Sequence, residues 1–425
     1  MAAETLERST PCPCCGANIE GPPAFVHEAV PLLLNVLAAA DQGARTAATG
    51  RLELYECPRC GLVFNRAFAG VPYGRDYFVD ATLSPRYRRH MDDVVDRLAA
   101  RVAGRTPFSV VDVGAGQGTF LAHLAARLGD RLAHAHGFDP AFRPSETRLP
   151  ANIGFTASML DAERAAALDF PVDVVVTRHV LEHVIDPVRF LSSFREHFAA
   201  PFTLVVETPN VAHTLERGLL HDFCYEHCAM ATDAALSEAL RRSGYEQIQI
   251  ESAFGGEYLL AIAVAPAAAA HGAPVDAALG ASVDGAPGQT LAAAERTATP
   301  SLAEVAGRFV REHRDRLMRA RSRGPVAIWG GAGKGALFAV LVDPDRALVD
   351  FVIDIHPSKQ GFFLPGAGHR VVAPKDAQRA AVRTIFVANA TYVDEIAAQC
   401  NALGLRVDLE CVGNRPHART TSGRP

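Results

Sequence analysis

The sequence lacks an apolar run long enough to cross a membrane. Its longest apolar tract near the amino terminus, residues 29–40, is interrupted by Pro31 and Asn35, whereas a membrane span needs about 20 apolar residues. The first eight residues include Glu4 and Glu7, where a signal peptide has a basic start followed by an apolar stretch. These absences lead us to expect a cytoplasmic protein with no membrane partner.

The chain also lacks an excess of basic residues. It has 42 Lys and Arg against 47 Asp and Glu, which gives a formal net charge of −5. Proteins that bind nucleic acids usually show a basic excess or a basic face, so we expect a small-molecule partner instead. A length of 425 residues with 49% hydrophobic content predicts two or three globular domains. Nothing in the sequence indicates an oligomeric state.

Composition divides the chain into five predicted parts. The first is short and rich in turns and cysteine, and the second alternates strand-like and helical runs, which is typical of a doubly wound α/β domain. The third has no aromatic residue and is rich in Ala, Pro and Gly, which predicts a linker. A second α/β domain and a flexible tail follow. The five parts are residues 1–85, 86–265, 266–300, 301–415 and 416–425.

Apolar runs mark the expected strands of both α/β domains. The last two runs of the first domain are adjacent and predict an antiparallel hairpin at the end of a parallel sheet. The second domain should begin with a helix that is capped by Ser301 and Glu304 and ends near residue 321. The expected strands are residues 109–113, 133–138, 172–177, 203–207, 247–251 and 258–264, and then 326–329, 348–353 and 384–387.

A glycine-rich turn carries the strongest chemical signal. Residues 110–119 read Val-Val-Asp-Val-Gly-Ala-Gly-Gln-Gly-Thr, and a helical run follows. Gly114, Gly116 and Gly118 allow a tight turn and close approach of a ligand at the carboxyl end of a parallel strand, where such folds bind nucleotides. A turn without a ligand, or an NAD site, is the alternative interpretation.

Two aspartates refine this prediction. Asp139 lies 21 residues beyond Gly118 at the end of the next expected strand, where a carboxylate can accept both ribose hydroxyls of a nucleoside. Asp112 lies inside the first strand, where a structural residue would be apolar. Its position before the first glycine suits the amino-acid moiety of S-adenosylmethionine better than a pyrophosphate.

These motifs resemble class I methyltransferases. Residues 177–187, Thr-Arg-His-Val-Leu-Glu-His-Val-Ile-Asp-Pro, are similar to the segment after strand four in the small-molecule branch of that class. The resemblance implies S-adenosylmethionine as methyl donor. It also implies that Met159 and Leu160 lie against the adenine and that His179 lies near the methionine part.

Two Cys-x-x-Cys pairs predict a metal centre. Cys12 with Cys15, and Cys57 with Cys60, are each followed by glycine and are typical ligands of a tetrahedral structural zinc. The 41 residues between the pairs exceed the usual separation in a zinc ribbon, so we expect a helical or looped insert. Cys14 is a spare thiol that could shift the ligand register. Reactive or redox thiols are the alternative.

The segment after the expected strand at 203–207 gathers polar groups where a reacting atom would lie. Asn210 follows this strand and is a candidate substrate contact, and residues 221–228 read His-Asp-Phe-Cys-Tyr-Glu-His-Cys. In this segment, His227 is a candidate general base, Glu226 would support it, and Tyr225 would donate to a substrate oxygen.

Over almost its whole length the sequence resembles three-domain sugar C-methyltransferases, which act on nucleotide-linked deoxy-keto-sugars. Their active-site segment reads Tyr-His-Glu-His, and residues 224–227 here read Cys-Tyr-Glu-His. The resemblance assigns the base role to His227 and the supporting role to Glu226. The tyrosine position is Cys224, so Tyr225 would have to replace it from the next position. This departure bears on the keto-sugar acceptor more than on methyl transfer.

The second α/β domain has its own glycine turn. Residues 327–335, Ala-Ile-Trp-Gly-Gly-Ala-Gly-Lys-Gly, do not form a P-loop, because Gly335 stands where Ser or Thr is required. They resemble the last domain of the same family, as do residues 352–361, 364–366 and 390–396. We expect Gly333 and Lys334 to receive an anion and Asp354 to bind ribose. A structural turn at a domain interface and an independent NAD site are the alternatives.

Carbon methylation is the function that the sequence favours. In this hypothesis His227 removes a proton alpha to a carbonyl, and the enolate attacks the methyl group to leave S-adenosylhomocysteine. One alternative is O- or N-methylation of another small metabolite. The others are a ribosomal-RNA methyltransferase, some of which also carry a four-cysteine zinc module, and a non-enzymatic scaffold that binds the donor.

Overall fold

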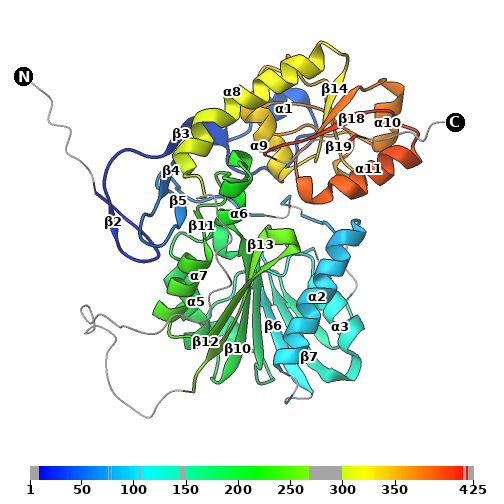
Figure 1. Ribbon diagram of the computed structural model, residues 1–425. Helices are drawn as coiled ribbons and strands as arrows, with labels where there is room; N and C mark the ends of the chain where they lie inside the picture. The colour runs from blue at the N-terminus through cyan, green and yellow to red at the C-terminus, as the bar shows by residue number, and fades with distance from the viewer. Residues whose placement is uncertain are drawn as a thin grey trace, which may run out of the picture.

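The computed structural model describes residues 9–267 and 299–414, apart from positions 75, 78, 103, 105–106 and 144–148, together with 418–419. Most of the predicted linker, residues 268–298, and most of the predicted tail lie outside this part. Figure 1 shows an upper and a lower α/β unit, with the amino-terminal strands beside both. Within the described ranges, no helix has the length and apolar character that a membrane crossing needs.

The amino-terminal unit is a small β module that borrows a strand from the central unit. Its sheet has the order β11-β5-β4-β3, and β11 comes from beyond residue 200. In place of the expected helical or looped insert, the residues between the two cysteine pairs form three strands, β2, β3 and β4, and the five-residue helix α1. The elements are β1 (Thr10–Pro11), β2 (Asn18–Ile19), β3 (Phe25–Pro31), α1 (Asp41–Arg45), β4 (Thr49–Glu56), β5 (Val63–Asn65) and β11 (Ala229–Met230).

The central sheet has seven strands in the order β12-β13-β10-β9-β6-β7-β8. Every pairing is parallel except the two made by β13, so the predicted antiparallel hairpin is present. The sequence analysis missed β8, a four-residue edge strand in which only Ile153 is buried. The strands are β6 (Phe108–Val113), β7 (Leu132–Phe138), β8 (Ile153–Thr156), β9 (Val174–Arg178), β10 (Phe202–Pro209), β12 (Glu246–Ala253) and β13 (Tyr258–Ala265).

Helices cover both faces of this sheet (Figure 1). Every residue of β6 is buried, as expected for a parallel strand that is covered on both sides. Ser84 caps the helix before it by accepting from Tyr87 N at 3.1 Å, and Pro85 occupies its first turn. The helices are α2 (Pro85–Arg101), α3 (Thr119–Leu128), α4 (Ala162–Ala166), α5 (Pro187–His197), α6 (Val211–Glu216) and α7 (Asp233–Arg242).

The carboxy-terminal unit is a second doubly wound sheet with the order β16-β15-β14-β17-β18-β19. Its first helix begins with the predicted capping box, in which Ser301 Oγ accepts from Glu304 N and Glu304 Oε2 accepts from Ser301 N. Its elements are α8 (Leu302–Arg321), β14 (Val326–Trp329), α9 (Gly333–Val342), β15 (Phe351–Ile353), β16 (Val371–Val372), α10 (Pro374–Arg379), β17 (Thr384–Val387), α11 (Val393–Ala402), β18 (Asp408–Cys411) and β19 (Ala418–Arg419).

One predicted strand of this unit is shorter than expected. The apolar run began at Leu348, but β15 begins only at Phe351. The buried carboxylate of Asp343 accepts from Leu348 N and Val349 N, so these residues close a loop instead of joining the sheet. Short 3₁₀ helices complete the fold at residues 129–131, 181–183, 220–222, 254–256, 357–359 and 390–392.

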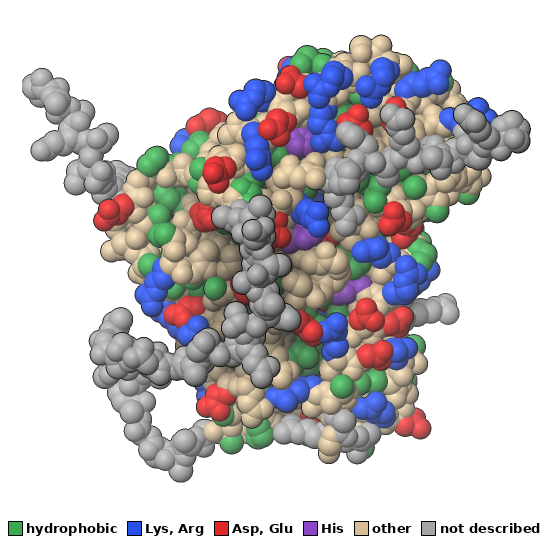
Figure 2. All heavy atoms as spheres, viewed as in Figure 1, with side chains coloured by type: hydrophobic (Ala, Val, Ile, Leu, Met, Phe, Trp, Pro, Cys, Tyr) green, Lys and Arg blue, Asp and Glu red, His purple; other side chains and the backbone are tan. Residues whose placement is uncertain are grey.

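The loop after β3 joins the amino-terminal module to the carboxy-terminal unit. Ala38 and Phe363 exchange backbone hydrogen bonds of 3.0 and 2.9 Å, and the Arg346 guanidinium pairs with the Asp41 carboxylate at 2.9 Å. One buried apolar cluster also contains residues of all three units. On the face shown in Figure 2, acidic and basic side chains are interspersed.

Candidate active site

One cavity of about 740 Å³ lies where the central strands end, and residues of all three units line it. It opens beyond the carboxyl ends of β6, β7, β9 and β10, the usual ligand position in a doubly wound sheet. It brings together most of the predicted site residues: Asp112, Gly114, Gly116, Asp139, Met159, Leu160, His179, Glu226, His227, Gly333 and Lys334. Gly118, Asn210, Tyr225 and Asp354 do not line it.

The glycine turn forms one wall of the cavity. Gly114 has a φ of +81°, and a Cβ added there would lie 2.1 Å from the Val180 side chain, so only glycine fits. Gly118 has a φ of +74° and begins α3 in the left-handed conformation, which gives it a structural role behind the wall. The turn therefore exposes backbone to the cavity, as the sequence predicted.

Asp139 is fixed against this turn. Its Oδ2 accepts from Gly116 N at 2.8 Å, and its Oδ1 accepts from Ala141 N at 2.7 Å. Burial raises the pKa of this carboxyl, and the two backbone N–H groups oppose that shift. The oxygens keep lone pairs toward the cavity, so the side chain is oriented to accept from ligand hydroxyls.

Asp112 is a buried carboxyl with a perturbed pKa. It is 2% exposed in the middle of β6. Burial raises its pKa to about 7, although the nearby Arg178 guanidinium acts in the opposite direction. A cationic ligand group beside this carboxyl would favour its ionised form and would form a strong ion pair with it.

A buried carboxylate, Glu207, contacts several side chains between the glycine turn and α2. It accepts from Arg178 Nε at 3.0 Å and contacts His90 Nε2 at 2.9 Å, and His179 Nε2 lies 3.0 Å from its Oε1. Although burial alone would lower it, the pKa of His179 is raised to about 10 by the Glu207 charge. His179 therefore presents a cation at the cavity.

The sequence analysis missed this network. Glu207 was treated only as the end of a strand, and Arg178 and His90 were not singled out. The available signal was an acid inside an apolar strand, the same signal that identified Asp112. Met159, by contrast, lines the cavity as expected and is 70% exposed at its mouth.

His227 lies on the opposite side of the cavity. Its Nδ1 is 3.1 Å from the Asp222 carbonyl oxygen, so a proton on Nδ1 donates to that oxygen and leaves Nε2 with a free lone pair. Burial lowers the pKa of His227, which keeps the ring neutral. The His183 ring lies 4.9 Å away in an edge-on arrangement. A neutral imidazole with a free Nε2 can act as a base.

Glu226 contacts the amino-terminal module. Its Oε1 accepts from Leu34 N at 3.1 Å, and its backbone oxygen lies 2.9 Å from His183 Nδ1. Its Oε2 is buried and has no partner in the part of the chain that the structure describes. Burial raises the pKa of this carboxyl, and the His183 charge opposes the shift. Glu226 makes no hydrogen bond to His227, so any support of a base there would be electrostatic.

The structure corrects the prediction for Tyr225. Its hydroxyl accepts from Ala69 N at 2.9 Å, and its ring packs on Phe68. A Cβ at Gly50 would lie 2.3 Å from this ring, which shows how tightly the module encloses it. Tyr225 therefore points away from the cavity and cannot donate to a substrate there, whereas Cys224 lines it. Of residues 224–227, only Tyr225 does not line the cavity.

Four other tyrosines line the cavity, namely Tyr73, Tyr77, Tyr87 and Tyr258, and the first two of them lie near the His227 segment. Tyr73 and Tyr77 come from the segment between the cysteine module and α2, and both line the cavity. The Tyr73 hydroxyl lies 2.6 Å from His183 Nδ1, and the Tyr77 hydroxyl accepts from Asn35 Nδ2 at 3.3 Å. Neither belongs to a recognisable motif, so the sequence offered no signal for them.

Gly333 and Lys334 line the cavity, but Lys334 already has anionic partners within the protein. Lys334 Nζ donates to Asp222 Oδ2 at 3.0 Å and to Glu257 Oε1 at 2.8 Å, so its charge is already balanced by two carboxylates. Gly333 N points at the Leu34 carbonyl oxygen, 3.3 Å away. Lys334 holds two units together, which is the interface role given above as the alternative.

The predictions for Asp354 and Asn210 are also corrected. Asp354 accepts from Gly331 N, His356 N and Lys359 Nζ, so both of its oxygens already have partners within the protein. Asn210 caps α6 by accepting from Ala212 N at 3.1 Å and donates to the Gly256 carbonyl oxygen at 3.0 Å. Both side chains stabilise the fold and lie outside the cavity.

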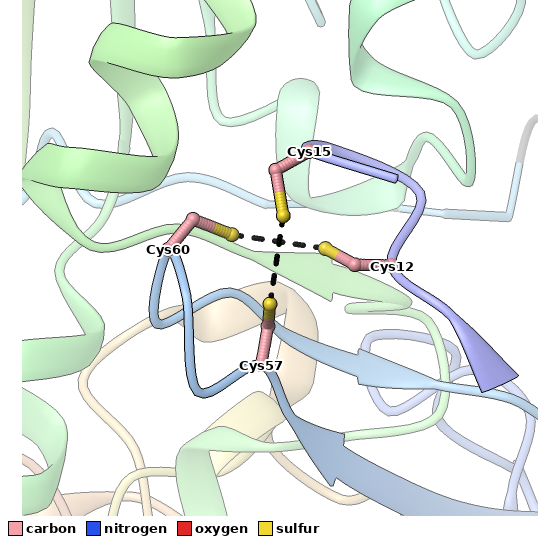
Figure 3. Close-up of side chains that lie close together, drawn as sticks. All are labelled: Cys12, Cys15, Cys57 and Cys60. Carbon is pink, nitrogen blue, oxygen red and sulfur yellow. Dashed lines mark hydrogen bonds between the residues drawn. The ribbon is translucent and has the colours of Figure 1, made fainter. Parts of the chain in front are cut away.

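The four predicted metal ligands converge as Figure 3 shows. Cys12 Sγ lies 3.7 Å from Cys60 Sγ, and Cys15 Sγ lies 3.6 Å from Cys57 Sγ. All four sulfurs are within 4.8 Å of one another. Sulfurs at about 2.3 Å from a tetrahedral zinc would be roughly 3.8 Å apart, so these residues fit that metal.

Cys14 is not part of this cluster. Its Sγ lies 3.2 Å from the Ala235 carbonyl oxygen in α7. The cysteine module is therefore attached to the central unit by a residue next to its metal ligands. The ligand register is Cys12 with Cys15, as the sequence analysis expected.

Two regions of the chain match known families. Residues 85–250 match a family described as a methyltransferase domain, and residues 294–406 match one described as a C-methyltransferase C-terminal domain. A curated relative, the ubiquinone biosynthesis O-methyltransferase of Caulobacter sp. (strain K31), is 34% identical over 116 residues. That match covers 25% of this chain and 44% of the relative, so the chain spans less than half of that relative's length.

Solved structures of methyltransferases are also similar. An O-methyltransferase family protein from Burkholderia thailandensis is 18% identical over 42% of this chain and 57% of its own, with a TM-score of 0.34. The carbon methyltransferase of CurJ is 15% identical over 43% and 56%, also with a TM-score of 0.34. Together with the strand order, the family match identifies the central unit as a methyltransferase domain with the class I α/β fold.

Proposed function

We propose that the chain transfers the methyl group of S-adenosylmethionine to a carbon atom of a small keto acceptor, specifically a nucleotide-linked keto-sugar. One observation carries this proposal. A domain of the C-methyltransferase type packs against the methyltransferase domain, and both line a single cavity that contains His227. The resemblance to sugar C-methyltransferases supplies the acceptor class.

The donor would lie along the glycine turn. Asp139 would accept from the ribose hydroxyls, and Met159 and Leu160 would cover the adenine. Asp112 would pair with the ammonium of the methionine part, which explains why an acid is retained inside β6. The cationic His179 would face the carboxylate of the same part. The glycines at 114 and 116 let the backbone approach the ligand.

The chemistry would begin at His227. Its Nε2 takes the proton from the carbon next to the acceptor carbonyl, and the electron pair of that C–H bond forms an enolate. The enolate carbon then bonds to the donor methyl group as the sulfur–methyl bond breaks, and S-adenosylhomocysteine leaves as a neutral thioether. The proton remains on His227 until the site opens to solvent.

A hydroxyl donor near the developing enolate oxygen would stabilise this step. Because Tyr225 faces away from the cavity, we assign this role to Tyr73, whose hydroxyl reaches the same cavity beside His183. This assignment keeps the chemistry that the sequence suggested and moves it to another residue. The cysteine cluster would hold a structural zinc without an open coordination position.

O-methylation is a second candidate, because the curated relative that matches part of this chain carries an O-methyltransferase name. The same His227 would then deprotonate a hydroxyl instead of a carbon. The two candidates share the donor site and differ in the atom that receives the methyl group.

The proposal is tested by incubating zinc-loaded full-length protein with labelled donor and a panel of nucleotide-linked keto-sugars. We expect at least one member to gain one methyl group while S-adenosylhomocysteine accumulates in equal amount. In deuterated water without donor, the same acceptor should exchange the proton next to its carbonyl. Transfer to hydroxyl-bearing acceptors alone, without such exchange, would favour O-methylation and contradict the proposal.

A further inference from the structure

We infer that Asp222 and Glu257 form a subsite that binds a hydrogen-bond donor of the acceptor, either a hydroxyl or a protonated amine, and rejects negative groups. The two carboxylates lie at the seam between the central and carboxy-terminal units. This inference rests on the proposed function, because it concerns the acceptor, but it is tested by binding and not by turnover. We call these two residues the carboxylate pair.

One ammonium group holds the carboxylate pair together. Lys334 Nζ lies 3.0 Å from Asp222 Oδ2 and 2.8 Å from Glu257 Oε1. Neighbours fix the same two oxygens: Thr214 Oγ1 donates to Asp222 Oδ2 at 3.2 Å, and Asn389 Nδ2 donates to Glu257 Oε1 at 2.8 Å. One oxygen of each carboxylate is thus used for structure.

The other oxygen of each carboxylate has no hydrogen-bond donor among the described residues, and the His221 Nε2 atom lies 3.9 Å from Asp222 Oδ1, beyond hydrogen-bond distance. Asp222 Oδ1 and Glu257 Oε2 are buried and make no hydrogen bond to any described residue, and both side chains are at least nine-tenths buried. Both residues also line the cavity. Buried carboxylate oxygens without donors are costly, so a ligand that supplies two donors would remove that cost.

The charge balance points to the same chemistry. Two carboxylates and one ammonium leave a net charge of −1 in a buried place. The adjacent His221 does not supply the missing charge, because burial lowers its pKa and its Nε2 is directed at the Ala388 carbonyl oxygen. A protonated amine would bring the group to neutrality, and a hydroxyl would satisfy it without changing its charge.

The charges that line the cavity also disfavour an anion beside the carboxylate pair. Among its described lining residues, Asp and Glu outnumber Lys and Arg seven to two. The cations are Arg178 and the protonated His179, which both pair with Glu207, and Lys334, which pairs with the carboxylate pair. The sugar end of a nucleotide-linked acceptor would therefore enter the cavity, and its phosphates would stay outside.

The test uses zinc-loaded full-length protein saturated with S-adenosylhomocysteine and measures fragment binding by ligand-observed NMR. The probes are glucosamine, glucose and glucose 6-phosphate, which present an ammonium, a hydroxyl and an anion on similar rings. We expect glucosamine or glucose to bind, and glucose 6-phosphate to bind at least about tenfold more weakly than the better of them. A preference for glucosamine identifies an amine, and equal binding identifies a hydroxyl.

Asp222→Asn should weaken binding of the probe about tenfold, since the replacement keeps the shape of the side chain and removes its charge. The matched control is Glu251→Gln on β12, a half-exposed acid paired with Arg97 that lies outside the cavity. If Asp222→Asn does not fold, Glu257→Gln replaces it. The inference is overturned if glucose 6-phosphate binds as well as the other probes, if no probe binds, or if the variant binds like the control. Probe binding without methyl transfer to any acceptor would instead count against the proposed function alone.

Discussion

Asp139 and Asp354 occupy equivalent positions in two different sheets and make the same pair of backbone hydrogen bonds. Each follows the second strand of its unit, accepts from a glycine of the preceding turn and accepts from the N–H two residues ahead. They differ in what covers them. Lys359 Nζ lies 3.2 Å from Asp354, whereas Asp139 faces the cavity. The position that we assign to the ribose is open in the central domain, and a salt bridge occupies the equivalent position in the carboxy-terminal domain.

This difference predicts that the same substitution, Asp to Asn, has different effects at the two positions. Asp139→Asn should weaken binding of S-adenosylhomocysteine by roughly 10- to 100-fold, because ribose hydroxyls lose a charged acceptor worth about 1.5–3 kcal/mol. Asp354→Asn should leave that affinity unchanged and lower only thermal stability. Titration calorimetry on both variants measures the difference, and equal loss in the two would contradict the assignment of the donor site.

Donor binding should depend on pH through Asp112. Burial raises the pKa of this carboxyl to about 7 in the free protein, and its pairing with the donor ammonium requires the ionised form. Affinity for S-adenosylhomocysteine should therefore fall as the pH drops below 7, by about tenfold for each pH unit. Asp112→Asn should bind S-adenosylhomocysteine more weakly. Its affinity and its binding enthalpy should both stay roughly constant from pH 5.5 to 7.5. An unchanged pH dependence in this variant would rule out Asp112 as the source.

The base is tested by His227→Gln. The amide retains the approximate shape but cannot take a proton, so turnover should fall about 10²- to 10⁴-fold while donor affinity stays within about twofold. His123→Gln is the control, since His123 pairs with Asp92 on the surface of α2 and α3, away from the cavity. Initial rates and donor titrations separate the two effects, and full activity of the His227 variant would remove it from the mechanism.

A pair of tyrosine variants distinguishes the structure from the sequence motif. Tyr225→Phe removes only the bond to Ala69 N, so it should cost about 1 kcal/mol of stability and leave kcat within about threefold. Tyr73→Phe removes the hydroxyl in the cavity and should lower kcat at least tenfold with little change in stability. Steady-state kinetics and thermal unfolding of both variants give the comparison. The reverse pattern would restore the motif-based role of Tyr225.

The cysteine cluster predicts one zinc ion for each chain. Cys57→Ser should abolish zinc binding and most of the folding free energy of the module, since structural zinc contributes on the order of 10 kcal/mol. Cys14→Ser should keep the metal, because Cys14 Sγ faces α7. Elemental analysis and unfolding curves measure both. Loss of zinc in the Cys14 variant would show that the register of the ligands is wrong.

Local patterns were predictable from the sequence, and long-range pairings were not. The glycine turn, Asp112, Asp139 and the cysteine ligands form short motifs whose geometry follows from the strand or knuckle that carries them. Lys334 and Asp354 also lie in such a motif, yet each has an ion-pair partner that was not predicted. Their counter-charges, Asp222 and Lys359, decide their roles, and the motif itself contains no information about those partners.

The residues on the acceptor side of the cavity were harder to predict from the sequence for the same reason. The direction of Tyr225 depends on the cavity that the amino-terminal module forms around its ring, a contact between residues more than 150 positions apart. Tyr73 was missed because its segment has no periodicity or motif. Family resemblance located the segment around His227 but could not say which side chains face inward.

The most direct test of the account is the carbon-13 NMR spectrum of the product made with a donor labelled in its methyl group. The account predicts that the labelled carbon is bonded to a carbon next to the acceptor carbonyl, that the signal disappears in His227→Gln, and that it persists in Tyr225→Phe. A labelled methyl group bonded to oxygen or nitrogen would contradict carbon methylation, even if the donor site behaved as described.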